Sequence, residues 1–328
     1  MPTNNYAERW SPELLEIQQQ ETLCSPFITT NVQWLDARTF HFTQMSTTGF
    51  KNHNRKGGWN KGEYLQTDVP FTCKHDRDVE FLVDTADVDE TNATASIENV
   101  AKTFQKTKAS PETDALFFSK TAQKALSLDG YHSETALSSY TKANVFSKLK
   151  KMIAAGKLRR YRAKGALIVY VVSDIMDLLE QSPDFTRKIE VTTIADGGTG
   201  IETRITEIDG VPIIEVIDDE VFYDKFSFEG EDGGFEPIAK VAASDEAEAV
   251  KGSRKLNVFI ASPLTTKVVP KTESIYYFAP GTHTEGDGYL YQHRSLSDVF
   301  TFPNGKDNKI DSIYVDVDTK EYDGTDAA

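Results

Sequence analysis

Hydrophobic and polar residues alternate near residue 40, where Phe40 and Phe42 flank His41. Alternation of this kind predicts a strand with one buried face. An acid-free, glycine-rich stretch follows at 50–62, and the segment 64–84 after it is rich in Thr, Val, Phe and Leu. We therefore predict a long two-stranded hairpin with a cationic tip. Such a hairpin needs another surface to lie on, because an isolated two-stranded ribbon is marginal in water.

The strongest helical pattern covers residues 92–128. Apolar residues recur at positions i, i+3, i+4 and i+7 from Ile97 to Phe104, which places them on one face of a helix. Pro111 lies inside this pattern and removes one backbone donor, so we predict a bend there, in either a kinked helix or two helices in series. A second amphipathic helix is predicted over 141–157.

Strands dominate from residue 165 onward. The apolar run 166–173 predicts a buried strand, and Asp209–Gly210 predicts a hairpin turn, because Asp-Gly accepts the positive φ angles of such turns. A short helix and further strands complete this half. The helix is expected at 173–182 and the strands at 187–194, 256–262, 274–280, 288–302 and 311–318. This order of elements predicts an α+β chain.

The 328 residues are 39% hydrophobic, which is enough for a sizeable core, and they carry a net charge of −15. Residues 1–164 hold 22 Lys and Arg against 19 Asp and Glu, a balance of +3, whereas residues 165–328 hold 14 against 32, a balance of −18. An acidic surface of this size argues against a dedicated nucleic-acid reader. The stretch 148–164 is basic and contains no acid, and a helix face that pairs with neighbouring acids is favoured there over nucleic-acid contact.

Membrane and secreted classes find no support in the sequence. No run of apolar residues is long enough to predict a membrane helix, and the first residues lack the basic-then-apolar pattern of a secretion signal. The two cysteines, Cys24 and Cys73, are too few for a disulfide scaffold or a Cys-rich zinc site. Their number fits a protein made in a reducing cytoplasm.

An acidic run is the strongest candidate for a metal site, and it comprises Asp84, Asp87, Asp89 and Glu90. A calcium loop needs a glycine turn among its ligands and a bidentate Glu after them, so a solvated helix N-terminus is the favoured interpretation. The histidines show no metal-ligand spacing, and no known nucleophile motif occurs. We therefore expect no catalytic residue, no cofactor and no metal. A cytoplasmic enzyme with an acidic metal site is the least favoured alternative.

Three parts of the sequence, taken in order and spacing, resemble the major capsid proteins of tailed bacteriophages, which have the Hong Kong 97-type coat fold. The first resembles the return of that family's extended loop (E-loop) and its spine helix, the second resembles its axial domain, and the third resembles its closing strands. The third part includes Lys271 and the stretch from Arg294 to Asp298. The parts are 75–122, then 141–189 with 204–216, and then 256–302.

The resemblance covers about residues 36–318 and implies a division of the chain into segments. An N-terminal arm and an E-loop hairpin with its return strand come first, then the spine helix of the peripheral (P) domain, the axial (A) domain, closing P-domain strands and an acidic tail. Their expected boundaries are 1–35, 36–84, 85–130, 131–270, 271–320 and 321–328.

The resemblance implies a structural protein without catalysis, which assembles in the host cytoplasm and resides in the virion. Hexamers and pentamers of one chain would form an icosahedral head around double-stranded DNA, held without sequence specificity. A separate scaffolding protein and a portal protein are the further partners implied, a decoration protein is compatible, and no membrane is involved. An encapsulin-type bacterial nanocompartment, a cargo container of the same fold, is the main alternative.

The hairpin tip is the predicted inter-subunit contact. Its cations and its large aromatic side chain would meet an acidic surface of a neighbouring copy, either the run that starts at Asp84 or the acidic loops of the second half. Pro111 would let one chain fit both five-fold and six-fold environments. No lysine–asparagine cross-link is predicted, because no partner Asn matches. The expected tip residues are Lys51, Arg55, Lys56, Trp59 and Lys61, and the expected acceptors are Asp84, Asp87, Asp89 and Glu90.

Overall fold

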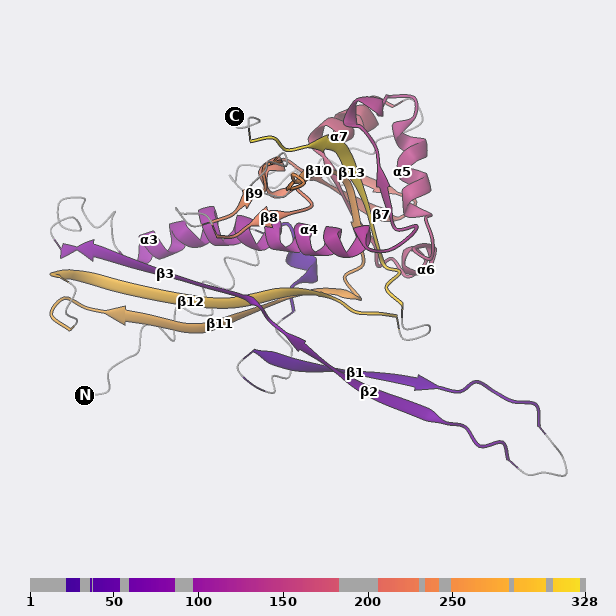
Figure 1. Ribbon diagram of the computed structural model, residues 1–328, viewed down its shortest axis with the longest axis horizontal. Helices are drawn as coiled ribbons and strands as arrows, with labels where there is room; N and C mark the ends of the chain where they lie inside the picture. The colour runs from indigo at the N-terminus through magenta and orange to yellow at the C-terminus, as the bar shows by residue number, and fades with distance from the viewer. Residues whose placement is uncertain are drawn as a thin grey trace, which may run out of the picture.

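Figure 1 shows the computed structural model of the protein. A six-stranded sheet, a three-stranded sheet, a projecting two-stranded hairpin and a short strand pair are arranged along one long helix. The structure describes residues 22–29, 36, 38–53, 59–85, 97–182, 206–229, 234–241, 249–282, 286–304 and 309–324.

The six-stranded sheet forms the centre of the main core, with the strand order β4-β13-β10-β5-β7-β6. All five residues of β5 are buried, as its uninterrupted apolar run predicts for a strand that is covered on both faces. β5 runs parallel to β7, and β13 runs parallel to the short edge strand β4. The strands are β4 (His132–Glu134), β5 (Ile168–Val172), β6 (Thr206–Ile208), β7 (Val211–Val216), β10 (Arg254–Ala261) and β13 (Ile313–Glu321).

The predicted hairpin turn joins β6 to β7. Asp209 and Gly210 have φ angles of 53° and 75°, the left-handed values that a type I′ turn requires at both central positions. The strands on either side pair antiparallel, with Ile208 opposite Val211. The Asp-Gly prediction is confirmed.

Helices cover this sheet, and aromatic side chains fill the space between the two layers. Phe118 of the long helix lies edge-on to Tyr170 and Phe259, with ring centroids 5.3 and 5.1 Å away. The helices are α3 (Ile97–Phe104), α4 (Ser110–Leu126), α5 (Val145–Ile153), α6 (Arg159–Arg162) and α7 (Ser173–Glu180), with 3₁₀ turns at Ser25–Phe27, Leu137–Ser139 and Asp219–Val221.

The long helix remains helical past Pro111. A five-residue π-helical segment, Gln105–Ala109, connects α3 to α4, and Pro111 lies in the first turn of α4. The N–H of Ser110 bonds the carbonyl of Gln105 five residues back, and the Ser110 hydroxyl donates to the same oxygen over 2.9 Å. The wider π turn therefore gives the Gln105 carbonyl two donors just before Pro111, whose own backbone nitrogen carries no hydrogen. A bend at Pro111 between different environments stays a prediction.

The described part of the expected N-terminal arm, residues 22–29, belongs to the main core. Phe27 is fully buried, and its ring centroid lies 4.6 Å from that of Phe117. Asp114 of α4 accepts hydrogen bonds of 3.0 Å from the backbone N–H groups of Leu23 and Cys24. Burial raises the pKa of Asp114 to about 6, and burial also raises the pKa of the Cys24 thiol.

The three-stranded sheet extends along α3 and α4 and is antiparallel, in the order β11-β12-β3. Its strands are β11 (Thr266–Phe278), β12 (Gly288–Thr301) and β3 (His75–Asp84). One face packs on α3, where Ile97 and Ala101 contact Tyr291, and the Phe81 and Phe104 rings meet at 5.3 Å. The predicted apolar face of this helix is therefore buried against the sheet.

The predicted hairpin is present, and it projects away from both sheets (Figure 1). β1 (Thr39–Thr47) pairs antiparallel with β2 (Tyr64–Thr72), from Thr39 opposite Thr72 to Thr47 opposite Tyr64. A further short pair, β8 (Phe226–Ser227) with β9 (Glu236–Pro237), lies above α4.

Two strand assignments made from sequence differ from the structure. Residues 64–84 do not form one return arm, because the chain leaves the hairpin after β2 and β3 joins β12 in another sheet. Within 271–320, β13 is not a closing P-domain strand, since it pairs with β10 inside the six-stranded sheet. The first error arises because alternation predicts that a segment is a strand but not which strand it pairs with. The second assignment was made from the family resemblance, which does not specify the partner of each strand. The strand expected at 187–194 lies outside the described residues.

Candidate assembly surface

The hairpin tip is closed by backbone and side-chain hydrogen bonds between its two arms. Thr48 and Glu63 extend the β1–β2 pairing, because the Thr48 N–H donates to the Glu63 carbonyl and the Glu63 N–H donates to the Thr48 hydroxyl, each over 3.0 Å. Asn60 Nδ2 donates to the carbonyl of Asn52 over 2.8 Å. These hydrogen bonds continue the contact between the two arms beyond the last paired residues of β1 and β2.

The structure places two of the predicted tip residues across from each other, one on each arm of the hairpin. Lys51 Nζ lies 3.4 Å from the carbonyl oxygen of Lys61 on the opposite arm. Both side chains are exposed. Arg55 and Lys56 lie outside the described residues. The described tip thus presents a pair of cations to whatever approaches it.

Three large aromatic residues near the tip are exposed to solvent. Trp59 is 93% exposed, with its ring 6.2 Å from that of His53, while Tyr64 is 74% exposed and Phe50 is fully exposed. Trp59 was predicted as a contact residue, but the other two were not, although Phe50 begins the acid-free stretch and Tyr64 follows it closely in the sequence. A group of exposed aromatic side chains marks a surface that binds another molecule.

The base of the hairpin is anchored in a small core of its own. Phe40 of β1 is buried beside Cys73, Val269, Leu296 and Phe302. The ring of Phe40 lies edge-on to that of Phe300 at a centroid distance of 5.0 Å. These contacts join the hairpin to β11 and β12, so the direction of the hairpin is set by the three-stranded sheet.

Ion pairs reinforce this base. Asp76 of β3 accepts from Arg294 of β12 and from Arg38 before β1, with a shortest distance of 2.6 Å to each. The hydrogen bond from Arg294 is the main reason why the pKa of the Asp76 carboxyl lies below its usual range. Asp36 accepts from the N–H groups of Arg38 and Thr39, which lowers its pKa as well. Because these groups are partly or fully exposed, they orient the hairpin more than they stabilise it.

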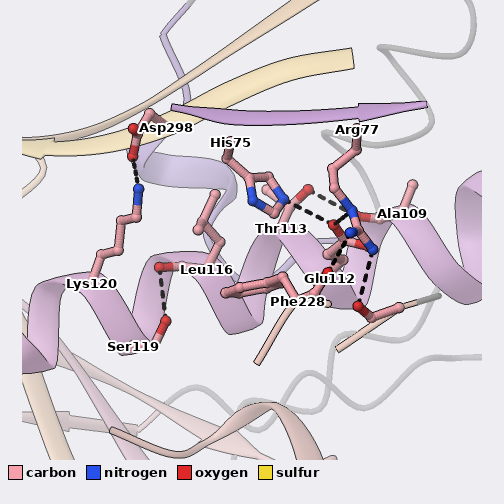
Figure 2. A network of polar contacts seen from close by, with 11 residues as sticks. His75, Arg77, Ala109, Glu112, Thr113, Leu116, Ser119, Lys120, Phe228 and Asp298 are labelled. Carbon is pink, nitrogen blue, oxygen red and sulfur yellow. Dashed lines mark hydrogen bonds and ion pairs between the residues drawn. The ribbon is translucent and has the colours of Figure 1, made fainter. Parts of the chain in front are cut away.

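A second polar network joins the three-stranded sheet to the long helix, and Figure 2 shows it at close range. Glu112 of α4 lies 2.8 Å from His75 Nε2 and 3.0 Å from Arg77 Nε, both of which belong to β3. Arg77 also donates to the carbonyls of Phe228 and Gly234, the latter over 3.0 Å. One arginine therefore ties together the sheet, the helix and the segment after β8.

Asp298 of β12 provides a further link in the same view (Figure 2). It is almost fully buried, it forms an ion pair with Lys120 of α4, and it accepts the N–H of Lys74 over 3.0 Å. Lys74 lies where the chain passes from β2 to β3, so this carboxylate fixes the backbone at the point where the chain leaves the hairpin. Arg294 and Asp298 belong to one stretch of the predicted resemblance, but they bind different partners, since Arg294 pairs with Asp76 and Asp298 pairs with Lys120.

The predicted acceptor Asp84 is far from the tip within one chain. It lies at the end of β3, opposite Gly288, at the end of the three-stranded sheet that points away from the hairpin tip (Figure 1). Leu82, two residues before it, is 51% exposed, and Tyr276 of β11 is 54% exposed on the same sheet. Asp87, Asp89 and Glu90 lie outside the described residues. The described tip and Asp84 can therefore meet only between two copies.

Two kinds of feature matter in the described part of the chain, metal-binding groups and membrane-spanning helices. No group of three or more His, Cys, Asp or Glu residues there is placed to hold a metal ion. Among the same residues, no helix is long and apolar enough to cross a membrane.

Comparisons with known proteins identify the fold. No protein-family model matches the chain, and no curated protein matches its sequence. The mature capsid of bacteriophage PhiM1 superposes with a TM-score of 0.56 at 15% identity, over 91% of this chain and 87% of that chain. The head of Helicobacter pylori bacteriophage KHP40 gives 0.51 at 12% identity, over 91% and 90%. Mycobacterium phage Ogopogo gives 0.50 at 10% identity, over 91% and 92%. The expected α+β fold of the Hong Kong 97 type is confirmed.

Proposed function

We propose that this chain is the major capsid protein of a tailed bacteriophage. Copies of it join as hexamers and pentamers into an icosahedral shell that encloses double-stranded DNA, and the protein has no catalytic role. The observation that carries the proposal is the projecting hairpin, which is firmly anchored at its base and exposes three aromatic residues and two cations at its tip. A monomer gains nothing from such a tip, whereas an assembling subunit does.

The fold supports the same function. Its likeness to the PhiM1 mature capsid and to the KHP40 head extends over about nine-tenths of the chain. A subunit that places one projecting element on the next copy makes a heterologous contact, and repetition of such contacts around symmetry axes closes a shell.

The tip reaches far enough to contact a neighbour. Each hairpin arm contains 9 paired residues, which at roughly 3.3 Å per residue extend about 30 Å. Lys51 and Lys61 would then arrive near Asp84, where Leu82 supplies an apolar surface for the tip aromatics. Charge and hydrophobicity are thus complementary between the two distant ends of the same molecule.

The remaining partners follow from the proposed role. A scaffolding protein and a portal would act during assembly in the host cytoplasm, and packaged DNA would touch the inner wall weakly. The balance of −18 in residues 165–328 supports weak DNA contact, because each neutralised phosphate requires a cation. A nanomolar, sequence-dependent DNA affinity at physiological salt would contradict this part of the proposal.

Negative-stain microscopy and sedimentation of the purified chain, alone and with a co-expressed scaffolding protein, test the proposal. We expect closed polyhedral shells or rings of uniform size. A monodisperse monomer under every condition would overturn the structural role. Enzymatic turnover that disappears when Asp87 and Asp89 are replaced by Asn would overturn the absence of catalysis.

A further inference from the structure

The parallel strands β5 and β7 have opposite charges at their two ends. The chain enters β5 from α6, and it leaves β5 directly into α7, so α6 and α7 lie at opposite ends of the strand pair (Figure 1). β5 has 5 residues, which at roughly 3.3 Å per residue separate the two ends by about 17 Å.

The amino ends of these strands are basic. The stretch 148–164, which contains the second half of α5 and all of α6, has no acidic residue, and Lys151, Arg159 and Lys164 on it are exposed. Asp209 in the β6–β7 turn neutralises part of this positive charge, because its carboxylate lies 3.6 Å from Lys150 Nζ and 3.4 Å from the guanidinium of Arg162.

Asp311 balances a further part, because it lies 3.7 Å from Arg160 and accepts the hydroxyl of Tyr161. These two carboxylates pair with Lys150, Arg160 and Arg162, and they do not take up the charges of the exposed Lys151, Arg159 and Lys164. The amino ends of β5 and β7 therefore keep a surplus of positive charge.

The carboxyl ends of the same strands are acidic. The Ser173 hydroxyl donates to the Val216 carbonyl over 3.2 Å, which joins the start of α7 to the end of β7. Asp174 follows the first of these residues, and Asp218 and Glu220 follow the second, all with exposed side chains.

A cation and a large apolar residue complete this end. Lys255 lies 2.7 Å from Asp219, so this cation is already paired. Ile217 is 82% exposed between the acids. A large apolar side chain rimmed by acids suits contact with another protein surface.

We propose that the basic end of this strand pair in one copy contacts the acidic end in the next copy, so that copies pack head to tail in a ring. This inference rests on the proposed function and deepens it by naming the two surfaces that meet inside a ring of subunits. A contact of the basic end of one copy with the acidic end of the next is heterologous and can repeat around a ring, whereas a two-fold axis centred on either end would place like charges together.

A second copy fits the basic end better than nucleic acid does. Tyr161, the one aromatic residue of this basic stretch, is 7% exposed, and its hydroxyl is bonded to Asp311, so no ring is available for base stacking. The rest of the chain repels phosphate, whereas the complementary acidic surface is present on every copy.

Charge-reversal variants test the contact. The basic-end variant carries Arg159→Glu and Lys164→Glu, the acidic-end variant carries Asp174→Lys and Glu220→Lys, and the swapped variant carries all four changes. A control with Lys124→Glu and Lys309→Glu alters the net charge as the basic-end variant does, at exposed positions elsewhere. Circular dichroism checks that each variant folds, and light scattering follows assembly.

We expect each two-residue reversal to slow assembly by about tenfold or more at low salt, while the control assembles as the parent does. The swapped variant should recover, because both ends change sign together. An equimolar mixture of the basic-end and acidic-end variants should form even-membered rings, since the two kinds must alternate.

Two results would overturn the inference. One is parent-like assembly of both reversal variants, and the other is unchanged assembly together with loss of binding to a duplex DNA probe in the basic-end variant, which would assign that end to nucleic acid. The parent chain separates the two proposals: if it forms no rings or shells, the proposed function fails, whereas if it assembles and the reversals do not matter, only this inference fails.

Discussion

Replacement of Trp59 by Ala is the sharpest test of the hairpin tip. The indole is 93% exposed, so its loss removes almost no contact within the monomer and should leave folding unchanged. A tryptophan buries about 200 Å² at an interface, which at about 25 cal/mol per Å² corresponds to about 5 kcal/mol. Ordering of the side chain and the surface that alanine retains reduce this to about 3 kcal/mol per contact. The association constant of each contact should therefore fall by about a hundredfold.

The assay is sedimentation of assembled particles over a range of protein concentrations, with urea unfolding of the monomer measured in parallel. Leu264→Ala is the matched control, because Leu264 is another exposed apolar residue, 56% exposed, outside the hairpin. We expect the Trp59 variant to unfold at the parent's urea concentration and to assemble only at much higher protein concentration, while the control does both as the parent does.

Parent-like assembly of Trp59→Ala at every concentration would refute the reasoning, because it would mean that the exposed ring stays in water inside the shell. Equal loss of assembly in both variants would refute it as well. In that case, any exposed apolar residue would matter, and the tip would have no special role.

Three further predictions concern the tip charges, a buried acid and the long helix. Arg55→Glu with Lys56→Glu should leave the monomer folded by circular dichroism yet block head formation, and raised salt should weaken early assembly; heads at parent yield at all salt concentrations would contradict this. The raised pKa of Asp114 means that its contribution to stability is present below about pH 4 and is lost, by about 3 kcal/mol, as the pH rises through about 6. The free energy of unfolding measured in urea should fall as the pH rises across this range, and Asp114→Asn should abolish this pH dependence. Pro111→Ala should fold but give heads of altered size or yield, and normal heads by microscopy would leave the predicted bend without support.

Local sequence patterns were sufficient to predict individual strands and turns. The alternation around Phe40 predicted the hairpin strand, the apolar run at 166–173 predicted β5, and Asp209–Gly210 predicted the β6–β7 turn. Each of these depends on residues that are neighbours in sequence, where periodicity and turn chemistry act directly.

Pairing between distant segments could not be predicted in the same way. β13 pairs with β10 inside the six-stranded sheet, and β3 pairs with β12 instead of continuing the hairpin. The sequence pattern of both segments predicts only that each is a strand. The network around Glu112 was also missed, because His75 and Arg77 are 37 and 35 positions away and meet it only when the sheet lies on the helix. The cluster His-Asp-Arg-Asp at the start of β3 was the available signal, since such a dense run of charge in a strand implies partners across an interface.

The distribution of rigidity along the chain fits assembly from weak contacts. At its base the hairpin is held by a buried aromatic cluster and by Asp76, so its direction is set before a neighbour arrives. At its tip it offers exposed cations that are each worth only about 0–1 kcal/mol when paired, together with aromatics that contribute more. A stiff arm lowers the entropy cost of each contact, while a modest tip energy lets a wrongly placed subunit leave again. In the proposed shell every copy would give one tip and receive one, so the number of such contacts would stabilise the closed shell.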